Sequence, residues 1–510
     1  MTVNAIRLQN FMGFRDTGWV ELRSINLLFG RNSTGKSAIL RALLLLRQSL
    51  DSRPEDGPLT FVAEDGQDFG GYRQMVRGQS TERKMSFWFC CEFAQTILPD
   101  PKQTANITEY SGDQIGNILL QEFGVEGKTD DERQRAKVEL RCRLIYRWDK
   151  RQKMVKLHGI DVYDPNRNLI LGAQEPKEAS EGIWSFWSDF FDPSSTDPDY
   201  VAWKSAILHI DAGFLPRLWV LQPENSQDSI GDMNDRDQGW GSKFVGCRKI
   251  LRGLCNDIAT FLYAIQYLGP LRAEPLRYYY VAGQPGNRLD AQGRHVVQTY
   301  LAGQRNQANQ DRLDQINHWL EYAGVGKRLV FNSVNHQKTL YEIKLVEIPD
   351  AQNLQPNLRE VGFGVSQVVP VLIQAMLAPA GSMVLIEQPE LHLHPAAQAE
   401  LGDLFLQAAA LNNVRFIVET HSEHLLLRLR RRIAESTAEW ITPESPLFAT
   451  PELVGIYHVQ RENGKSEMER VLVSGLGKII SPSAFKGFFS NDLEEIEMLA
   501  EASLAHSDKG

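Results

Sequence analysis

Residues 25–37 read INLLFGRNSTGKS, and this stretch decides the fold. Ile25–Phe29 is a short apolar run, typical of a buried strand, that ends at Gly30. From Lys36, the sequence KSAILRALLLLRQSL has strong helix formers and apolar residues on most faces, as a buried helix does. Between them, residues 30–37 match GxxxxGK[ST] at every fixed position. The sequence therefore predicts a phosphate-binding loop between a strand and a helix.

The residue types of this loop suit the phosphate oxygens of a nucleotide. Glycines let the backbone curl so that its N–H groups point inward, and the helix N-terminus adds partial positive charge. We expect Lys36 to reach the β- and γ-phosphates and Ser37 to offer its hydroxyl to Mg²⁺. A chance match in a glycine loop is the alternative, which the flanking strand and helix disfavour. The candidate nucleotide-binding residues of the loop are Gly30, Arg31, Asn32, Ser33, Thr34, Gly35, Lys36 and Ser37.

Two further apolar strands are predicted far along the chain. Residues 383–387, MVLIE, end in the carboxylate of Glu387. A strand that brings a Mg²⁺ ligand to the phosphate loop must end in such a carboxylate. The next strand, 414–418, leads into the sequence ETHS, which contains His421. A histidine at the tip of a parallel strand points into the crevice where ligands of α/β sheets lie.

From residue 340 onward, strand and helix patterns alternate, as they do in a parallel sheet. We therefore expect an α/β fold, a P-loop NTPase domain that is discontinuous because a large mixed α/β insertion divides it. The expected elements are a strand over 340–347, a helix over 366–378, a strand over 382–387, a helix over 396–410, a strand over 414–419 and a helix over 422–436.

The pattern loosens between residues 100 and 340, and polar turns are expected around 100–135, 161–200 and 222–243. Helices are expected at about 245–265 and 308–323, and an acidic helix at about 491–504. The absence of sustained heptads argues against a long coiled coil. The predicted organisation is an N-terminal part of the ATPase domain (1–100), an insertion (101–265), a C-terminal part of the ATPase domain (266–440) and a C-terminal region (441–510).

Composition is that of a soluble globular protein. Hydrophobic residues make up 42% and charged residues 23% of the 510 residues, and the net charge of −9 is not that of a dedicated nucleic-acid binder. Five cysteines without a CxxC pair indicate free thiols in a reducing compartment. The apolar stretch 368–386 contains Pro370 and Gly381, which divide it into a helix and a strand, so we expect no membrane span and a cytoplasmic protein.

The sequence GFGVSQ, residues 362–367, introduces the helix that precedes the strand ending at Glu387. Ser366 in its first turn has two interpretations. It could cap the helix, or it and the helix N-terminus could bind a γ-phosphate.

The order GxxxxGKS, GFGVSQ, LIEQPELHLHP and ETHS resembles the ATP-binding-cassette type of ATPase, in the branch that contains the structural-maintenance-of-chromosomes (SMC) proteins. Within it, the chain is most similar to the overcoming-lysogenisation-defect family and to stand-alone ATPases of bacterial anti-phage systems of the Septu type. IRLQNFMGFRDT and YLGPLRAEPLRYY (267–279) also resemble that group. The resemblance covers roughly 1–95 and 260–425.

The resemblance implies an ATPase with ATP and Mg²⁺ as cofactors. In that family two subunits sandwich two ATP molecules, so a homodimer or higher homo-oligomer is expected. It implies that Ser366 contacts the γ-phosphate held by the partner subunit, that Glu387 is the Mg²⁺ acid, and that His421 is the switch histidine. It also implies that the LHLHP stretch lines the dimer seam.

One residue departs from the family pattern. The position after the Mg²⁺ acid is Gln388, where the family usually has the general-base glutamate. An amide cannot accept a proton, although it can orient a water molecule. Glu390, two residues on, is the alternative base, and slow hydrolysis would fit either residue.

Three other interpretations are disfavoured. His392, His394, His421 and His424 match no zinc signature. The Arg428–Arg432 run is interpreted first as a solvated helix face and second as a contact for DNA or a partner. The roughly 85 residues after Ser422 show no nuclease pattern, so no nuclease domain is recognised in this chain.

Two functions therefore stand as hypotheses. In the first, the chain is the ATPase and sensor or scaffold of an anti-phage defence complex and controls a separately encoded effector, such as a nuclease or toxin. In the second, it is a DNA-repair or chromosome-associated ATPase with DNA as its direct partner. The acidic balance and the missing coiled coil favour the first.

Overall fold

The computed structural model divides the chain into two compact units, one of residues Met1–Glu21 and Ala38–Tyr263 and the other of residues Leu22–Ser37 and Ala264–Gly510. The predicted acidic helix at 491–504 lies outside the described residues. The structure describes residues 2–51, 57–63, 66–96, 118–119, 128–129, 135–175, 184–190, 206–209, 215–220, 242–281, 289–304, 310–323, 327–347 and 355–481.

The second unit is built on a parallel sheet with strand order β19-β4-β18-β17-β13, and β20 pairs antiparallel with β19. The phosphate-loop strand β4 therefore lies beside β18, and β18 lies beside β17, so the carboxyl ends of all three strands share one edge. The bounds are β4 Ile25–Phe29, β13 Ile265–Leu268, β17 Met383–Glu387, β18 Arg415–Glu419, β19 Val454–Glu462 and β20 Lys465–Val471.

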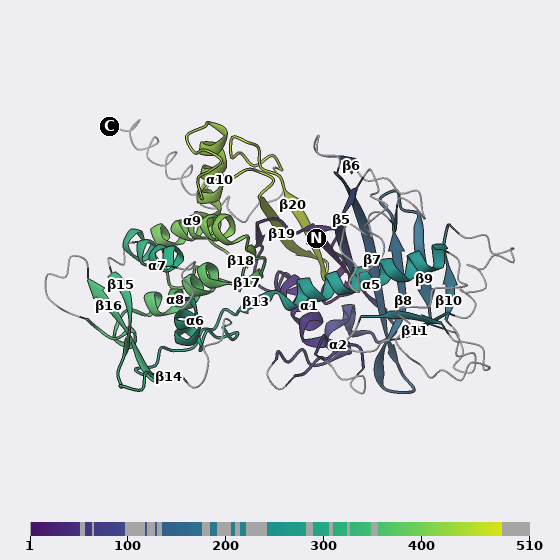
Figure 1. The fold of residues 1–510 in the computed structure, drawn as a ribbon, viewed down its shortest axis with the longest axis horizontal. Helices are drawn as coiled ribbons and strands as arrows, with labels where there is room; N and C mark the ends of the chain where they lie inside the picture. Colours follow the sequence, from purple (N-terminus) through teal and green to yellow (C-terminus); the bar gives the residue numbers. More distant parts are fainter. Residues whose placement is uncertain are drawn as a thin grey trace, which may run out of the picture. The chain divides into compact units, whose positions relative to one another are not determined.

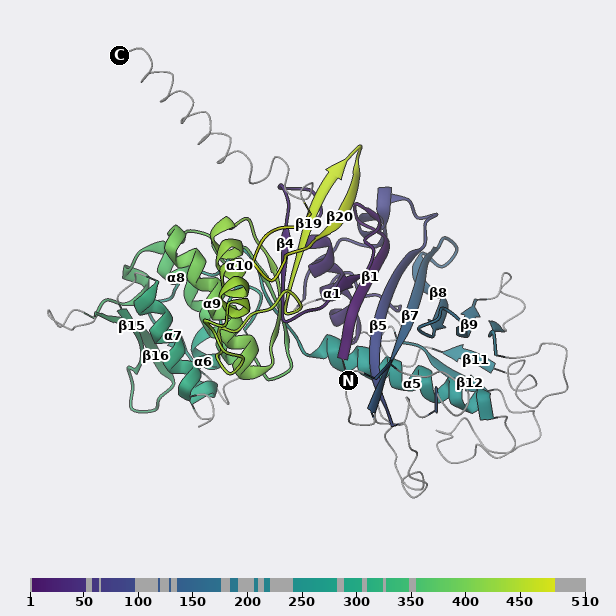
Figure 2. The same cartoon turned by 90° about the horizontal axis from the view of Figure 1, so that it is seen from above.

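Helices cover one face of this sheet (Figures 1 and 2). Alternate residues of the strands, among them Leu27, Ile386 and Val418, are buried in one core cluster with apolar residues of the helices. The alternation follows from the strand period of two. The helices are α6 Val296–Gln304, α7 Gln310–Tyr322, α8 Phe363–Leu377, α9 Pro395–Asn412 and α10 Glu423–Thr437, with a 3₁₀ turn at Leu358–Glu360 and a small sheet of β14 Tyr279–Tyr280, β16 Leu340–Glu347 and β15 Lys327–Ser333.

The first unit contains antiparallel strands in the order β10-β9-β8-β7-β5-β1-β2. One face of these strands is apolar and buried, for example at Phe87, Phe89 and Leu144, and α5 contacts β1 and β5. The bounds are β1 Thr2–Phe11, β2 Phe14–Asp16, β3 Val20–Glu21, α1 Ser37–Ser49, α2 Tyr72–Met75, β5 Met85–Thr96, β6 Lys128–Thr129, β7 Arg135–Asp149, β8 Met154–Tyr163, β9 Leu169–Gln174, β10 Ser185–Trp187, β11 Ala206–His209, β12 Arg217–Val220 and α5 Ser242–Tyr263.

The α/β fold class and the strand and helix order from residue 340 onward are confirmed, with boundaries shifted by a few residues. The expectation of polar turns over 161–200 was wrong at Leu169–Gln174, which is the buried strand β9. The helix expected from 366 begins earlier, at Phe363, because Gly362 is its N-cap. Among the described residues, no helix is long and apolar enough to cross a membrane.

Candidate nucleotide-binding site

The phosphate loop lies between β4 and α1, as the sequence predicts. Gly30 has a φ of 152°, and a Cβ at this position would lie 2.1 Å from the carbonyl oxygen of Val459, so only glycine fits. Ser33 and Gly35 also have positive φ angles, 64° and 111°. These angles curl the loop backbone in the way that an anion-binding nest requires.

Lys36 is buried inside this curl. Its Nζ donates to the carbonyl oxygens of Gly30 and Arg31 at 2.8 and 3.0 Å. Burial lowers the pKa of Lys36, and the charges of Glu419, Glu390 and Glu387 act in the opposite direction. The ammonium group therefore lies in the field of three carboxylates at the carboxyl edge of the sheet.

Ser37 contacts a carboxylate that we did not single out from the sequence. Its hydroxyl donates to Oε2 of Glu419 at 2.7 Å. Glu419 ends β18, and its other oxygen, Oε1, lies 3.8 Å from Nζ of Lys36. The sequence signal that could have identified Glu419 is its position at the end of the strand, two residues before His421.

The end of β17 presents Glu387 and Gln388. Glu387 pairs in register with Glu419 on the neighbouring strand, and Oε1 of Glu387 accepts a hydrogen bond from the hydroxyl of Tyr267 at 2.8 Å. Gln388 has a φ of 46°, and its N–H donates to the carbonyl oxygen of Glu419 at 2.7 Å. The chain therefore turns sharply away from the sheet directly after Glu387.

Glu390 and His421 are brought together by this turn. Oε1 of Glu390 accepts a hydrogen bond from the backbone N–H of His421 at 2.7 Å. Burial raises the pKa of Glu390. Burial, followed by the charge of Lys36, lowers the pKa of His421, so its imidazole is favoured in the neutral form.

Ser366 does not cap its helix, which corrects one of the two sequence interpretations. Gly362 is the N-cap, and the Ser366 hydroxyl donates to the carbonyl oxygen of Phe363 at 2.8 Å within the first turn. Gly364 is required nearby, because a Cβ there would lie 2.4 Å from the carbonyl oxygen of His392. The start of α8 is thus packed closely against the LHLHP segment.

The C-terminal hairpin β19–β20 supports the phosphate loop, which the sequence did not suggest. The hydroxyl of Ser466 donates to the carbonyl oxygen of Thr34 at 2.6 Å. Arg461 donates to the carbonyl oxygen of Ser33 at 3.5 Å, and Val459 provides the oxygen that excludes a side chain at Gly30. The hairpin therefore belongs to the loop's immediate surroundings.

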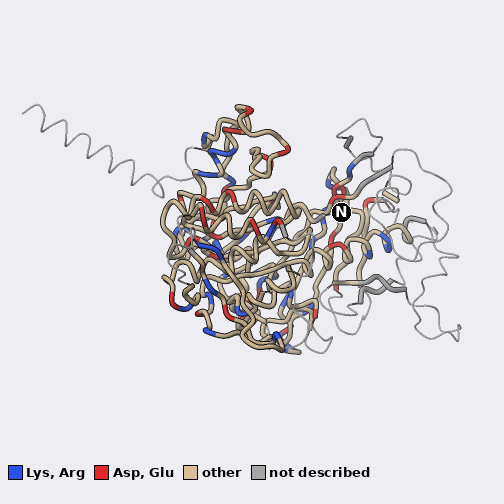
Figure 3. Tube along the Cα trace, turned by 60° about the vertical axis from the view of Figure 1, so that its left-hand side comes forward, with Lys and Arg blue, Asp and Glu red and all other residues tan. Residues whose placement is uncertain are grey.

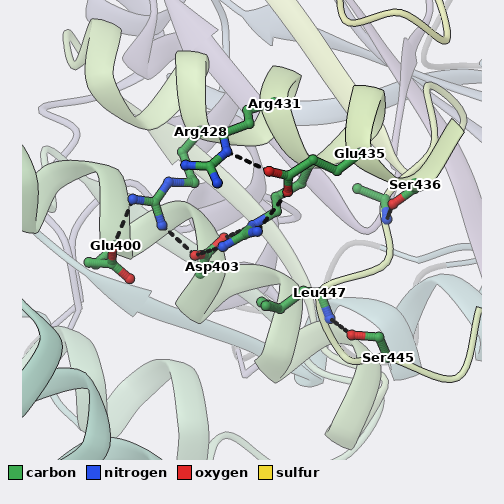
Figure 4. A network of polar contacts seen from close by, with 10 residues as sticks. Glu400, Asp403, Arg428, Arg431, Glu435, Ser436, Ser445 and Leu447 are labelled. Atoms are coloured by element: carbon green, nitrogen blue, oxygen red, sulfur yellow. Dashed lines mark hydrogen bonds and ion pairs between the residues drawn. The ribbon is translucent and has the colours of Figure 1, made fainter. Parts of the chain in front are cut away.

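The arginine run on α10 is neutralised by acidic residues. Arg428 bonds to Glu400 and Asp403 (Figure 4). Arg432 bonds to Asp403 and Glu435. Arg431, which is more exposed, pairs with Glu435. Figure 3 shows Lys and Arg intermixed with Asp and Glu along the trace. A solvated helix face was thus the wrong description for Arg428 and Arg432, which form a partly buried ion-pair network with α9.

Two family models match separate parts of the chain. Residues 1–161 match the family described as "AAA ATPase domain", and residues 264–428 match "AAA domain, putative AbiEii toxin, Type IV TA system". The segments carry the phosphate loop and the two strands that end in Glu387 and Glu419. Over these two segments the chain is similar to AAA ATPase domains. No curated protein matches this sequence.

Solved structures of SMC heads are similar over most of the chain at low identity. An SMC head bound to the C-terminal winged-helix domain of ScpA shares 11% identity with a TM-score of 0.38, covering 92% of this chain and 98% of that one. The SMC head domain from Thermotoga maritima shares 9% with a TM-score of 0.35, covering 93% and 100%. An SMC head from Pyrococcus furiosus bound to the C-terminal domain of ScpA shares 10% with a TM-score of 0.36, covering 92% and 96%.

Proposed function

We propose that this chain binds ATP with Mg²⁺ and hydrolyses it slowly. The observation that supports this most is the arrangement of Lys36 and Ser37 inside a curled glycine loop, facing carboxylates at the ends of β17 and β18. Lys36 supplies a cation for the β- and γ-phosphates. Ser37 and Glu387 supply oxygen ligands for Mg²⁺, which neutralises charge that develops on the phosphates.

Replacing Lys36 tests this assignment directly. Lys36→Ala removes the side-chain cation directed at the phosphates, so calorimetric titration should show ATP affinity reduced by more than about 10-fold. Lys478→Ala, at an exposed position, is the matched control and should bind like the wild type. Unchanged affinity of Lys36→Ala would overturn the site.

We further propose that two subunits associate head to tail around ATP, with Ser366 contacting the phosphates held by the partner. Support comes from the position of Ser366 in the first turn of α8, where the helix N-terminus favours an anion. Ser366→Arg should block ATP-dependent dimerisation and leave ATP binding intact. Light scattering that shows this variant associating like the wild type would contradict the geometry.

The cellular role we propose is that of the ATPase and sensor or scaffold subunit of an anti-phage defence complex. Its effector, a nuclease or toxin, would be encoded separately. The family description that names a toxin of a type IV toxin–antitoxin system supports this class, as does the resemblance to lysogenisation-defect and Septu-type ATPases.

Co-purification with the products of adjacent genes, with and without ATP, tests the role. A nuclease or toxin that binds in one nucleotide state is the expected result. Hydrolysis by the isolated protein that is stimulated by DNA would instead favour a DNA-repair or chromosome-associated ATPase. The neutralised arginines of α10 argue against that helix as the DNA contact.

A further inference from the structure

Glu419 occupies the strand position between the two halves of the proposed site. It pairs in register with Leu28 of the phosphate-loop strand β4 on one side and with Glu387 of β17 on the other. Glu419 is a buried residue, with 7% of its surface exposed. Burying a carboxylate costs several kcal/mol unless it is paired, so its partners indicate its purpose.

Those partners are the two side chains of the phosphate loop that carry chemistry. One carboxylate oxygen accepts the Ser37 hydroxyl at 2.7 Å, and the other lies 3.8 Å from Nζ of Lys36. Lys36 itself is 3% exposed and is held by two loop carbonyl oxygens. In phosphate loops the serine hydroxyl binds Mg²⁺, so Glu419 lies beside the expected position of the metal ion.

The charges around this point leave a negative excess. The carboxylates of Glu387, Glu390 and Glu419 all act on Lys36, and the buried Arg272 also acts on Glu387 and Glu390. In addition, Oε2 of Glu390, a side chain with 7% exposure, has no hydrogen-bond partner among the described residues. Among these described residues, three carboxylates, two of them buried, face two cations, and this balance favours the uptake of a further cation.

We propose that Glu419 is a Mg²⁺-site residue, acting with Glu387 and Ser37 either directly or through water. This inference rests on the proposed ATP site. Mg²⁺ is held in proteins by one or two carboxylates together with phosphate oxygens and water, and does not need an all-protein cage. A carboxylate on each of two adjacent strand ends, beside Ser37, provides such a set.

The competing reading is that Glu419 is an inhibitory latch, which holds Lys36 and Ser37 away from a nucleotide. The two roles predict opposite effects when the charge of Glu419 is removed. A metal-site residue is required for Mg²⁺ to strengthen nucleotide binding. A latch, once removed, leaves the Mg²⁺ requirement unchanged and makes nucleotide binding tighter at every Mg²⁺ concentration.

The experiment is a titration of the full-length chain with a fluorescent ATP analogue at a series of Mg²⁺ concentrations. For Glu419→Gln, we expect the Mg²⁺ concentration that gives the half-maximal gain in affinity to rise by about 10-fold or more. Affinity without Mg²⁺ should be retained. Glu423→Gln, four residues on in the first turn of α10, is the control and should follow the wild type.

Glu419→Asp is the second variant, since it keeps the charge and shortens the reach. It should show an intermediate Mg²⁺ requirement, and thermal melting of each variant verifies its folding. An unchanged Mg²⁺ requirement in both variants, or tighter binding at all Mg²⁺ concentrations, would overturn the assignment of Glu419. A wild-type chain that binds no nucleotide under any condition would instead overturn the proposed function itself.

Discussion

The hydroxyl of Tyr267 lies 2.8 Å from Oε1 of Glu387, so the edge strand β13 fixes the carboxylate proposed to bind Mg²⁺. Partners that orient a metal ligand from the second layer contribute about 10- to 100-fold to metal affinity or activity. Tyr267→Phe removes only the hydroxyl and should weaken Mg²⁺-dependent ATP binding by about 10-fold. A Mg²⁺ titration with Tyr279→Phe as control checks this, because the Tyr279 hydroxyl accepts a hydrogen bond from the backbone of Leu276 instead. Equal Mg²⁺ requirements in the two variants would show that the Tyr267 hydroxyl does not orient Glu387.

Arg272 holds the backbone at the same place. Its Nη2 donates to the carbonyl oxygens of Glu387 and Gln388 at 2.9 and 3.3 Å. Burial lowers the pKa of Arg272 to about 10, although the negative charges of Glu390 and Glu387 act to raise it. A lysine ammonium is more strongly hydrated than a guanidinium and loses its proton more readily when buried, so Arg272→Lys should reduce ATP turnover by about 10-fold or more. Arg415→Lys is the control, because Arg415 is half-buried and begins β18, at the opposite end from Glu419. If both variants lose turnover equally, Arg272 serves stability alone.

The α9–α10 ion-pair network should contribute mainly to stability. Asp403 is 6% exposed and accepts hydrogen bonds from Arg428 and Arg432. Asp403→Asn leaves both guanidinium groups partly uncompensated, so the free energy of unfolding should fall by about 3 kcal/mol, as for a broken buried pair. Arg431→Gln, which breaks an exposed pair with Glu435, should cost less than about 1 kcal/mol. Denaturant unfolding of the two variants makes the comparison, and similar losses would contradict this ranking.

The sequence predicted the parts of the site that depend on local pattern. The loop at 30–37 and the strands that end at Glu387 and Glu419 were predictable because a glycine loop and apolar runs of strand length are local signals. The contact of Ser37 with Glu419 joins positions 382 residues apart, and no local pattern encodes it.

The same reason explains the elements that the sequence analysis missed. The strands of the first unit between residues 135 and 174 are paired mainly with one another and with β5, so tertiary contacts specify them. The hairpin that bonds Ser466 to Thr34 is likewise specified by a tertiary contact.

The raised pKa of Glu390 gives a pH dependence with a definite sign. Because burial raises the pKa in the folded state above the ordinary value of 4.5, the native state binds a proton that the unfolded chain releases. The contribution of Glu390 to the free energy of unfolding is therefore fully present below pH 4.5 and is lost as the pH rises through the folded pKa. Glu390→Gln should flatten this part of the stability curve. Denaturant unfolding between pH 4.5 and 8 measures it, and identical slopes in both proteins would contradict the raised pKa.

The last prediction concerns the proton acceptor for hydrolysis. Gln388 turns away from the sheet with a φ of 46° and has no basic oxygen, whereas Glu390 is held by the backbone N–H of His421 at the edge of the site. We therefore expect Glu390→Gln to bind ATP but to lose turnover by about 100-fold, the scale of a lost general base. Gln388→Glu should raise turnover, because it places a carboxylate at the position where the family resemblance implies the base. Steady-state phosphate release from both variants and the wild type, with any co-purified partner added, separates the two roles. Equal rates in all three proteins would mean that neither residue limits hydrolysis. Bound ATP would then hold the subunits together, and its hydrolysis would not drive the function.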